Sequence, residues 1–130
     1  MAASRNVTTK STKINGWRSN FTASSHANGS PDVFETGDLR VDFDQHLAYK
    51  AGKPVDLTPT EFSILAFLAR APGQVQPSRA ILQKVWGPAY RDEVHLLRVN
   101  VARLRRKIED VASDPRYVLT HARAGYSLAE

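Results

Sequence analysis

The segment that most constrains the fold runs from Val94 to Ile108 and has the pattern of an amphipathic helix. Its apolar residues recur every three or four positions, which places them on one face of an α-helix. They are Val94, Leu97, Val101, Leu104 and Ile108. The other faces carry cations and no acidic residue, and these cations are Arg98, Arg103, Arg105, Arg106 and Lys107. Such a helix fits the DNA major groove, where arginine matches phosphates and guanine edges; the alternative is a solvated surface helix.

Charge is unevenly distributed along the chain. The formal net charge is +5, but residues 1–30 hold four cations and no acidic residue. Residues 31–130 are nearly neutral, with 14 basic and 13 acidic side chains, the acidic ones gathered early and the arginines late. This separation permits one basic face on a nearly neutral domain.

Composition divides the chain at residue 32. Residues 1–32 are rich in Ser, Thr, Asn and Ala without a sustained hydrophobic period, which predicts a disordered basic tail that adds only unspecific affinity for DNA. Ile14, Trp17 and Phe21 have helical spacing there, which we interpret as chance rather than as a docking segment. Residues 33–130 are expected to form one domain. The absence of Cys excludes disulfides and Cys-based zinc sites. No apolar run is long enough to span a membrane, so the cytoplasm is the expected location.

Short strands open the predicted domain. Leu39, Val41 and Phe43 alternate with polar residues, as in a half-buried strand. Further strands are predicted at Phe34–Thr36, His46–Lys50 and Lys53–Leu57, which gives an antiparallel meander. We interpret the Asp42/Asp44 pair as a solvated strand face rather than as a catalytic or metal-binding pair.

Three helices and a hairpin follow the meander. The run Thr58–Glu61 has the residues of a capping box with proline in the first turn, which predicts a helix that ends at Pro72-Gly73. A second helix is expected from Ser78, as its cap, to Trp86, and the third from about Asp92 to Asp110. A hairpin is expected at Tyr117–Thr120 and Tyr126–Leu128. The predicted fold is therefore α+β, a winged helix-turn-helix with an N-terminal antiparallel β-meander, three helices and a C-terminal β-hairpin wing.

Several spaced motifs carry a family resemblance over residues 33–128. They are Leu57-Thr58-Pro59-Thr60-Glu61-Phe62, Pro72-Gly73-Gln74-Val75, Val85-Trp86-Gly87, Leu97-Arg98-Val99, Arg103-Leu104-Arg105-Arg106-Lys107-Ile108-Glu109 and Gly125-Tyr126. In this order they resemble the OmpR/PhoB-type effector domain of response regulators, and most of all its KdpE-like branch.

The resemblance implies double-stranded DNA as the partner, with the third helix in the major groove and the wing in the adjacent minor groove. Val99 and Arg103 would occupy base-reading positions, facing a thymine methyl and a guanine. Asn100 would donate to a phosphate or an adenine. Arg98 and Arg105 would be phosphate contacts or internal ion pairs, and Arg106 and Lys107 complete the expected DNA-binding set on this helix. It also implies head-to-tail dimers on DNA and an RNA polymerase contact through the loop Gly87–Arg91.

Two departures from the family pattern bear on function. The family hairpin commonly reads Arg-Gly-x-Gly-Tyr, but here it is Ala122-Arg123-Ala124-Gly125-Tyr126. We predict that Arg123 is the wing's groove contact, and the alternative is that it only replaces a turn glycine. The tail of residues 1–32 is too short for a receiver domain, so we expect no phosphorylation control within this chain. The sequence is compatible both with an excised effector domain and with a stand-alone protein that carries a tail.

Enzyme readings have little support in the sequence. The four histidines, His26, His46, His95 and His121, have no ligand spacing, and no Gly-rich phosphate loop is present. We therefore expect no catalysis, no metal and no cofactor. The alternative function is a winged-helix protein-interaction module with little DNA specificity. Salt dependence separates the two, because DNA binding weakens steeply with salt.

Overall fold

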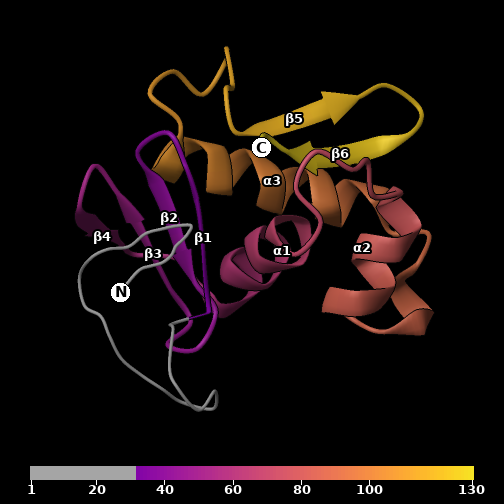
Figure 1. Cartoon of the computed structure of the whole chain (residues 1–130). Helices are drawn as coiled ribbons and strands as arrows, with labels where there is room; N and C mark the ends of the chain where they lie inside the picture. The colour runs from indigo at the N-terminus through magenta and orange to yellow at the C-terminus, as the bar shows by residue number, and fades with distance from the viewer. Residues whose placement is uncertain (1–31) are drawn as a thin grey trace. The chain divides into compact units, whose positions relative to one another are not determined.

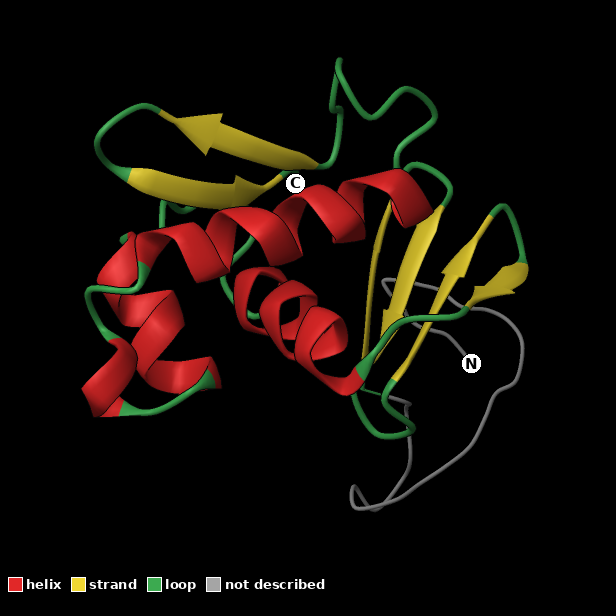
Figure 2. Ribbon diagram, turned by 180° about the vertical axis from the view of Figure 1, so that it is seen from behind, coloured by secondary structure: helices red, strands yellow, loops and turns green. Residues whose placement is uncertain are grey.

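The computed structural model describes residues 32–130, which form two β-sheets and three α-helices (Figures 1 and 2). The elements in chain order are β1 (Val33–Thr36), β2 (Leu39–Asp42), β3 (Leu47–Lys50), β4 (Lys53–Val55), α1 (Pro59–Ala69), α2 (Ser78–Val85), a 3-10 turn (Pro88–Tyr90), α3 (Val94–Ile108), β5 (Val118–His121) and β6 (Gly125–Leu128). This order confirms the predicted winged helix-turn-helix. Residues 1–31 of the predicted tail, with Ile14, Trp17 and Phe21, lie outside the described residues.

The meander is a four-stranded sheet in the order β1-β2-β3-β4, with β2, β3 and β4 antiparallel. Leu39, Val41 and Ala48 are buried and belong to the same core cluster as the apolar residues of α1. Two of the strands are shorter than predicted: β3 begins at Leu47 and β4 ends at Val55.

Asp42 corrects one sequence interpretation. Its side chain is not on a solvated strand face, because the residue is only 6% exposed. Its Oδ1 accepts a hydrogen bond from the backbone N–H of Gln45 at 3.0 Å, so it caps the turn between β2 and β3. Burial raises the pKa of Asp42 above its usual value. Asp44 lies beyond the end of β2 and is exposed, as expected.

The start of α1 has the predicted capping box. Thr58 Oγ1 accepts from the Glu61 N–H at 3.1 Å, and Glu61 Oε1 accepts from the Thr58 N–H at 3.0 Å. The helix ends at Ala69, with Arg70 as its C-cap, before the Pro72-Gly73 pair. Both ends of this helix were therefore close to their predicted places.

Helix α2 begins at Ser78 as predicted, but its cap and the start of α3 differ from the prediction. The N-cap of α2 is Pro77 and no side chain caps the helix, so the prediction that Ser78 caps it was wrong. The first residue of α3 is Val94 rather than Asp92, because Glu93 has a non-helical backbone conformation. The apolar face of α3 is buried as predicted, through Leu97, Val101, Leu104 and Ile108.

The hairpin β5–β6 is fixed along β6 by backbone bonds to the segment between α1 and α2. The Gln76 N–H donates to Tyr126 O at 2.7 Å, and the Tyr126 N–H donates to Gln76 O at 3.1 Å. Gly125 permits this approach, because a Cβ at this position would lie 1.9 Å from Gln76 O and its φ is +145°. The root of the wing is thus held to the helical part of the domain.

The core lies between the two sheets and the three helices. In both views the hairpin lies along one side of α3 and α1 lies on the other (Figures 1 and 2). Within residues 32–130, no helix is both long and apolar enough to cross a membrane.

Candidate nucleic-acid interface

The outward face of α3 carries arginines that the fold leaves accessible. Arg98, Arg103 and Arg106 are exposed, and within the described part of the chain none has a hydrogen-bond or ion-pair partner. Helix α3 contains no acidic residue. At about 100° per residue, Arg103 and Arg106 lie opposite the buried apolar stripe, and Arg98 lies at its margin. Three of the five cations that the sequence predicted on the basic side of this helix are therefore exposed without such a partner.

Val99 and Ala102 lie between these arginines on the helix surface. Ala102 is exposed and Val99 is half-buried. Small apolar side chains at such positions let a helix approach base edges closely, and a valine methyl can contact the methyl group of thymine.

Asn100 does not belong to this face. It is 7% exposed, and its Nδ2 donates to Leu96 O at 2.9 Å, one turn earlier in α3. The physical reason is helical geometry, because Asn100 lies about 40° from the buried Leu104 around the helix axis. The structure therefore removes Asn100 from the expected DNA-binding set.

Arg105 points toward the hairpin rather than outward. Its Nε and Nη2 donate to Val118 O at 3.1 and 2.8 Å, and Nη2 also donates to Thr120 Oγ1 at 2.6 Å. Of the two alternatives left open for Arg105, an internal contact is the one found, although its partners are β5 oxygens rather than a carboxylate.

Lys107 is also engaged inside the domain. Its Nζ lies 2.6 Å from Glu61 Oε1, and the Glu61 side chain is only 2% exposed. Burial by itself raises the pKa of Glu61, but the hydrogen bonds from Lys107 and Thr58 outweigh it, so the pKa is lowered. The Glu61 side chain thus has two roles, as part of the α1 capping box and as the partner of a cation on α3.

Glu109 has a positioning role that the sequence did not indicate. The residue is 8% exposed and follows directly after α3. Its carboxylate accepts the backbone N–H groups of three successive residues: Arg116 at 2.7 Å, Tyr117 at 3.0 Å and Val118 at 2.8 Å. No spacing rule links Glu109 to a strand nine residues later, so only the tertiary structure revealed this contact.

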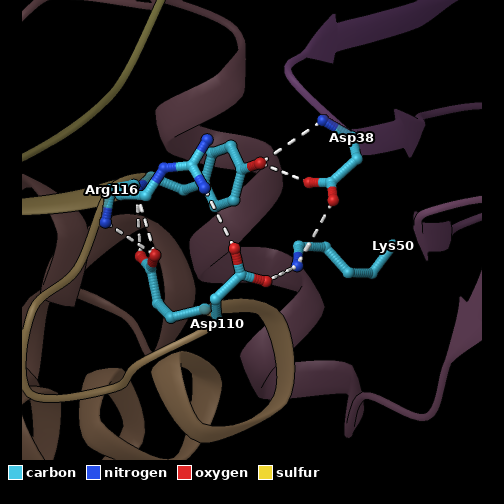
Figure 3. Close-up of polar contacts among 6 residues, drawn as sticks. Asp38, Lys50, Asp110 and Arg116 are labelled. Carbon is cyan, nitrogen blue, oxygen red and sulfur yellow. Dashed lines mark hydrogen bonds and ion pairs between the residues drawn. The ribbon is translucent and has the colours of Figure 1, made fainter.

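A polar cluster next to Glu109 joins the end of α3 to the N-terminal sheet (Figure 3). Asp110 bridges Lys50 Nζ at 2.5 Å and Arg116 Nη1 at 2.9 Å. The Tyr117 hydroxyl donates to Asp38 Oδ1. The hydrogen bond from Tyr117 holds the pKa of Asp38 below its usual value, and the hydrogen bond with Asp110 raises the pKa of Lys50. These contacts fix the base of the hairpin on the side away from its tip.

The wing tip is the exposed turn Ala122–Ala124 between β5 and β6. Its turn is closed by the Ala124 N–H, which donates to His121 O at 2.9 Å. Arg123 has φ of +65°, a left-handed conformation that an arginine adopts at a cost. It occupies the position at which the family pattern has glycine. Its exposed guanidinium has no partner among the described residues.

The region between α2 and α3 contains an ion pair to α2 and exposes an aromatic ring. Arg79 Nη2 lies 2.9 Å from Asp92 Oδ1, and Tyr90 is 44% exposed. In residues 32–130, no group of three or more His, Cys, Asp or Glu side chains is arranged to hold a metal ion.

Two helices packed at a turn, a sheet before them and a hairpin after them define a winged helix-turn-helix protein. Residues 52–128 match the family "Transcriptional regulatory protein, C terminal". The chain belongs to this family, and its domain is of the OmpR/PhoB type.

Relatives and solved structures agree with this assignment. The chain is 46% identical over 94 residues to the transcriptional regulatory protein KdpE of Mycobacterium tuberculosis, which covers 72% of this chain and 42% of that protein. It is 37% identical over 95 residues to the DNA-binding response regulator MtrA of Mycolicibacterium smegmatis, covering 73% of this chain and 42% of MtrA. The chain thus spans less than half the length of these relatives.

The fold is similar to that of a DNA-binding domain solved with DNA. The crystal structure of the Klebsiella pneumoniae RstA DNA-binding domain in complex with the RstA box has a TM-score of 0.68 at 29% identity. This similarity covers 75% of this chain and 97% of that domain.

Proposed function

We propose that this chain is the DNA-binding part of a transcriptional regulator of the response-regulator type and that it binds double-stranded DNA sequence-specifically. Helix α3 would enter the major groove and the wing tip the adjacent minor groove. The observation that carries the proposal is the outward face of α3, where three exposed arginines have no partner among the described residues and no acidic residue is present in the helix. Arginine in such a position binds phosphates and forks onto guanine.

The proposed contact set is smaller than the set expected from the sequence. It comprises Arg98, Val99, Arg103 and Arg106 on α3, and Arg123 on the wing. Asn100, Arg105 and Lys107 are left out because each already has a partner inside the domain. The family is one of transcriptional regulators, which supports a DNA-binding role.

Selection of bound duplexes from a random library tests this proposal, followed by affinity measurements at several salt concentrations. We expect one preferred sequence and an affinity that falls with salt by about 0.9 log unit per log unit for each phosphate neutralised. No enrichment of any sequence, with an affinity that is insensitive to salt, would favour the alternative protein-interaction module.

We propose RNA polymerase as a second partner, through the loop Gly87–Arg91. The support is the exposed ring of Tyr90 in a turn that the ion pair between Arg79 and Asp92 holds beside α3. Tyr90→Ala should leave the affinity for the selected duplex unchanged and weaken the complex with polymerase on that duplex. Unchanged polymerase binding would contradict this part of the proposal.

We also propose that two chains bind DNA as a head-to-tail pair. On a duplex with two tandem copies of the selected sequence, binding should be cooperative, with a higher affinity for each chain than on one copy. Independent binding to the two copies would contradict it.

A further inference from the structure

One residue of the wing, Val118, is hydrogen-bonded through both its backbone N–H and its backbone C=O. The partners are the side chains of Arg105, in α3, and Glu109, the C-cap of α3. Arg105 donates to Val118 O, through Nε at 3.1 Å and Nη2 at 2.8 Å. Glu109 Oε2 accepts the Val118 N–H at 2.8 Å. Arg105 and Glu109 are four residues apart, so they lie on the same side of the helix. All three bonds involve a charged group, and charged groups make the stronger hydrogen bonds.

The same two side chains make further hydrogen bonds on either side of Val118. Arg105 Nη2 also donates to Thr120 Oγ1 at 2.6 Å, and Thr120 lies two residues closer to the wing tip than Val118. Glu109 also accepts the N–H groups of Arg116 and Tyr117, which lead into the strand. Strand β5 is therefore fastened along its length to α3.

Strand β6 is held by the backbone of the segment between α1 and α2, and the guanidinium of Arg105 in α3 also lies over the Tyr126 ring, 5.8 Å from its centroid. The backbone bonds run between Tyr126 and Gln76 and from the Gly73 N–H to Leu128 O. The three tip residues of the hairpin, Ala122, Arg123 and Ala124, are exposed and have no hydrogen bond to α3 or to the segment between α1 and α2.

We propose that Arg105 and Glu109 form a clamp that sets the position of the wing tip relative to the outward face of α3. They are positioning residues: they do not touch DNA, and they act through Arg123. This inference rests on the proposed DNA binding. A helix and a wing held at a fixed separation bind two neighbouring grooves together, without the loss of conformational freedom that a loose wing would bring.

Two duplexes test the clamp, both with the selected core sequence. One carries an A·T-rich flank on the wing side, and the other is cut short so that the wing has no flank to contact. Arg105→Met keeps the length of the side chain and removes its hydrogen bonds. We expect it to lower affinity for the flanked duplex about tenfold, as loss of one or two charged hydrogen bonds implies. Affinity for the short duplex should change less than about twofold.

A double-variant cycle with Arg123→Ala separates the clamp from a direct phosphate contact. If Arg105 acts through the wing tip, adding Arg105→Met to Arg123→Ala lowers affinity no further. If Arg105 binds a phosphate, the two losses add and occur on both duplexes, which would overturn the proposal. Arg105→Lys sharpens the test. A lysine still binds a phosphate and would keep the affinity for DNA, but it cannot donate to Val118 O and Thr120 Oγ1 at the same time in the geometry of a guanidinium. We expect it to behave like Arg105→Met.

Hydrogen exchange of the free protein provides a readout that does not depend on DNA. Glu109→Ala should raise the exchange rates of the Tyr117 and Val118 amides about tenfold or more, because their acceptor is lost. The Tyr126 amide, which bonds to Gln76, should keep its protection. Lys53→Met, in β4, is the control that removes a cation outside the clamp, and it should change neither readout.

The outcomes distinguish the two proposals. If the wild-type chain binds no duplex while the exchange rates change as expected, the DNA-binding proposal fails and the contacts of Arg105 and Glu109 remain purely structural. If the chain binds DNA but Arg105→Met leaves the affinity for the flanked duplex unchanged, the clamp is wrong and the DNA-binding proposal stands.

Discussion

The outward and inward sides of α3 carry charged groups of the same kinds but use them differently. On the outward side, Arg103 and Arg106 are exposed and have no partner among the described residues. On the inward sides, Arg105 bonds to the hairpin and Lys107 to the buried Glu61 of α1. The difference shows that the role of a cation depends on what packs against its side of the helix and not on its place in a basic run. Substitutions on the outward side should change DNA binding directly, and those on the inward sides should change stability or, at Arg105, the position of the wing.

The largest expected effect is at the root of the wing. Gly125→Ala should lower the free energy of unfolding by about 3 kcal/mol or more, because the new Cβ would clash with the backbone of Gln76. In addition, an alanine adopts the positive φ of this position only with strain. Chemical denaturation measures this. Gly52→Ala is a matched control, since Gly52 has φ of +81° but nothing within 4 Å of the new Cβ. It should cost only about 1 kcal/mol. Equal losses in the two variants would mean that the close approach to Gln76 does not matter.

Removal of the inward cation of α3 should come next in size. Lys107→Met should lower the free energy of unfolding by about 2–3 kcal/mol, because it leaves the Glu61 carboxylate buried without its cation, while water screens part of the loss at the partly exposed lysine. DNA affinity at neutral pH should stay within about twofold of wild type. A large loss of affinity in the folded variant would return Lys107 to the DNA-binding set.

The pH dependence of this pair follows from the lowered pKa of Glu61. A carboxylate whose pKa is lower in the folded state stabilises the fold above its unfolded pKa, and this contribution is lost as the pH falls through the folded value. The difference between wild type and Lys107→Met should therefore be full above about pH 5 and shrink below about pH 4. Glu61→Gln combined with Lys107→Met should remove the pH dependence, and its persistence would assign it to another group.

On the outward side, Arg103→Ala should lower affinity for the preferred duplex by about 1–3 kcal/mol and relax the preference at one position. The free energy of unfolding should hardly change, because Arg103 has no internal partner among the described residues. Binding measured on the preferred duplex and on its single-base variants tests this. An equal loss on every sequence would make Arg103 a phosphate contact rather than a base contact.

The smallest effects are expected at the wing tip, where stability and binding should move in opposite directions. Arg123→Gly should raise the free energy of unfolding by about 0.5–1 kcal/mol, because glycine adopts φ of +65° without strain. The same change should weaken binding, most of all where the flank is A·T-rich and the minor groove narrow. Arg123→Ala is the control, because it removes the charge but keeps the strained backbone. Equal losses on A·T-rich and G·C-rich flanks would rule out the groove contact.

Local patterns in the sequence were sufficient for the elements and their order. Each of these patterns involves residues a few positions apart: the capping box at Thr58, the apolar stripe of α3 and the turn residues between the strands. Their structural consequences can therefore be predicted from the sequence alone. The same patterns placed Arg98, Arg103 and Arg106 on the accessible side of the helix.

Contacts between distant segments decided the rest. Asn100 and Arg105 lie at the margins of the apolar stripe, where the helical period alone does not say whether another element covers them; the structure buries the first and places the second against β5. Glu61 meets Lys107 across 46 positions of sequence. The sequence by itself determined which side of α3 carries cations. The tertiary structure decided which of those cations remain available to a partner, because a charge is satisfied by whatever group the packed neighbours place within hydrogen-bond distance.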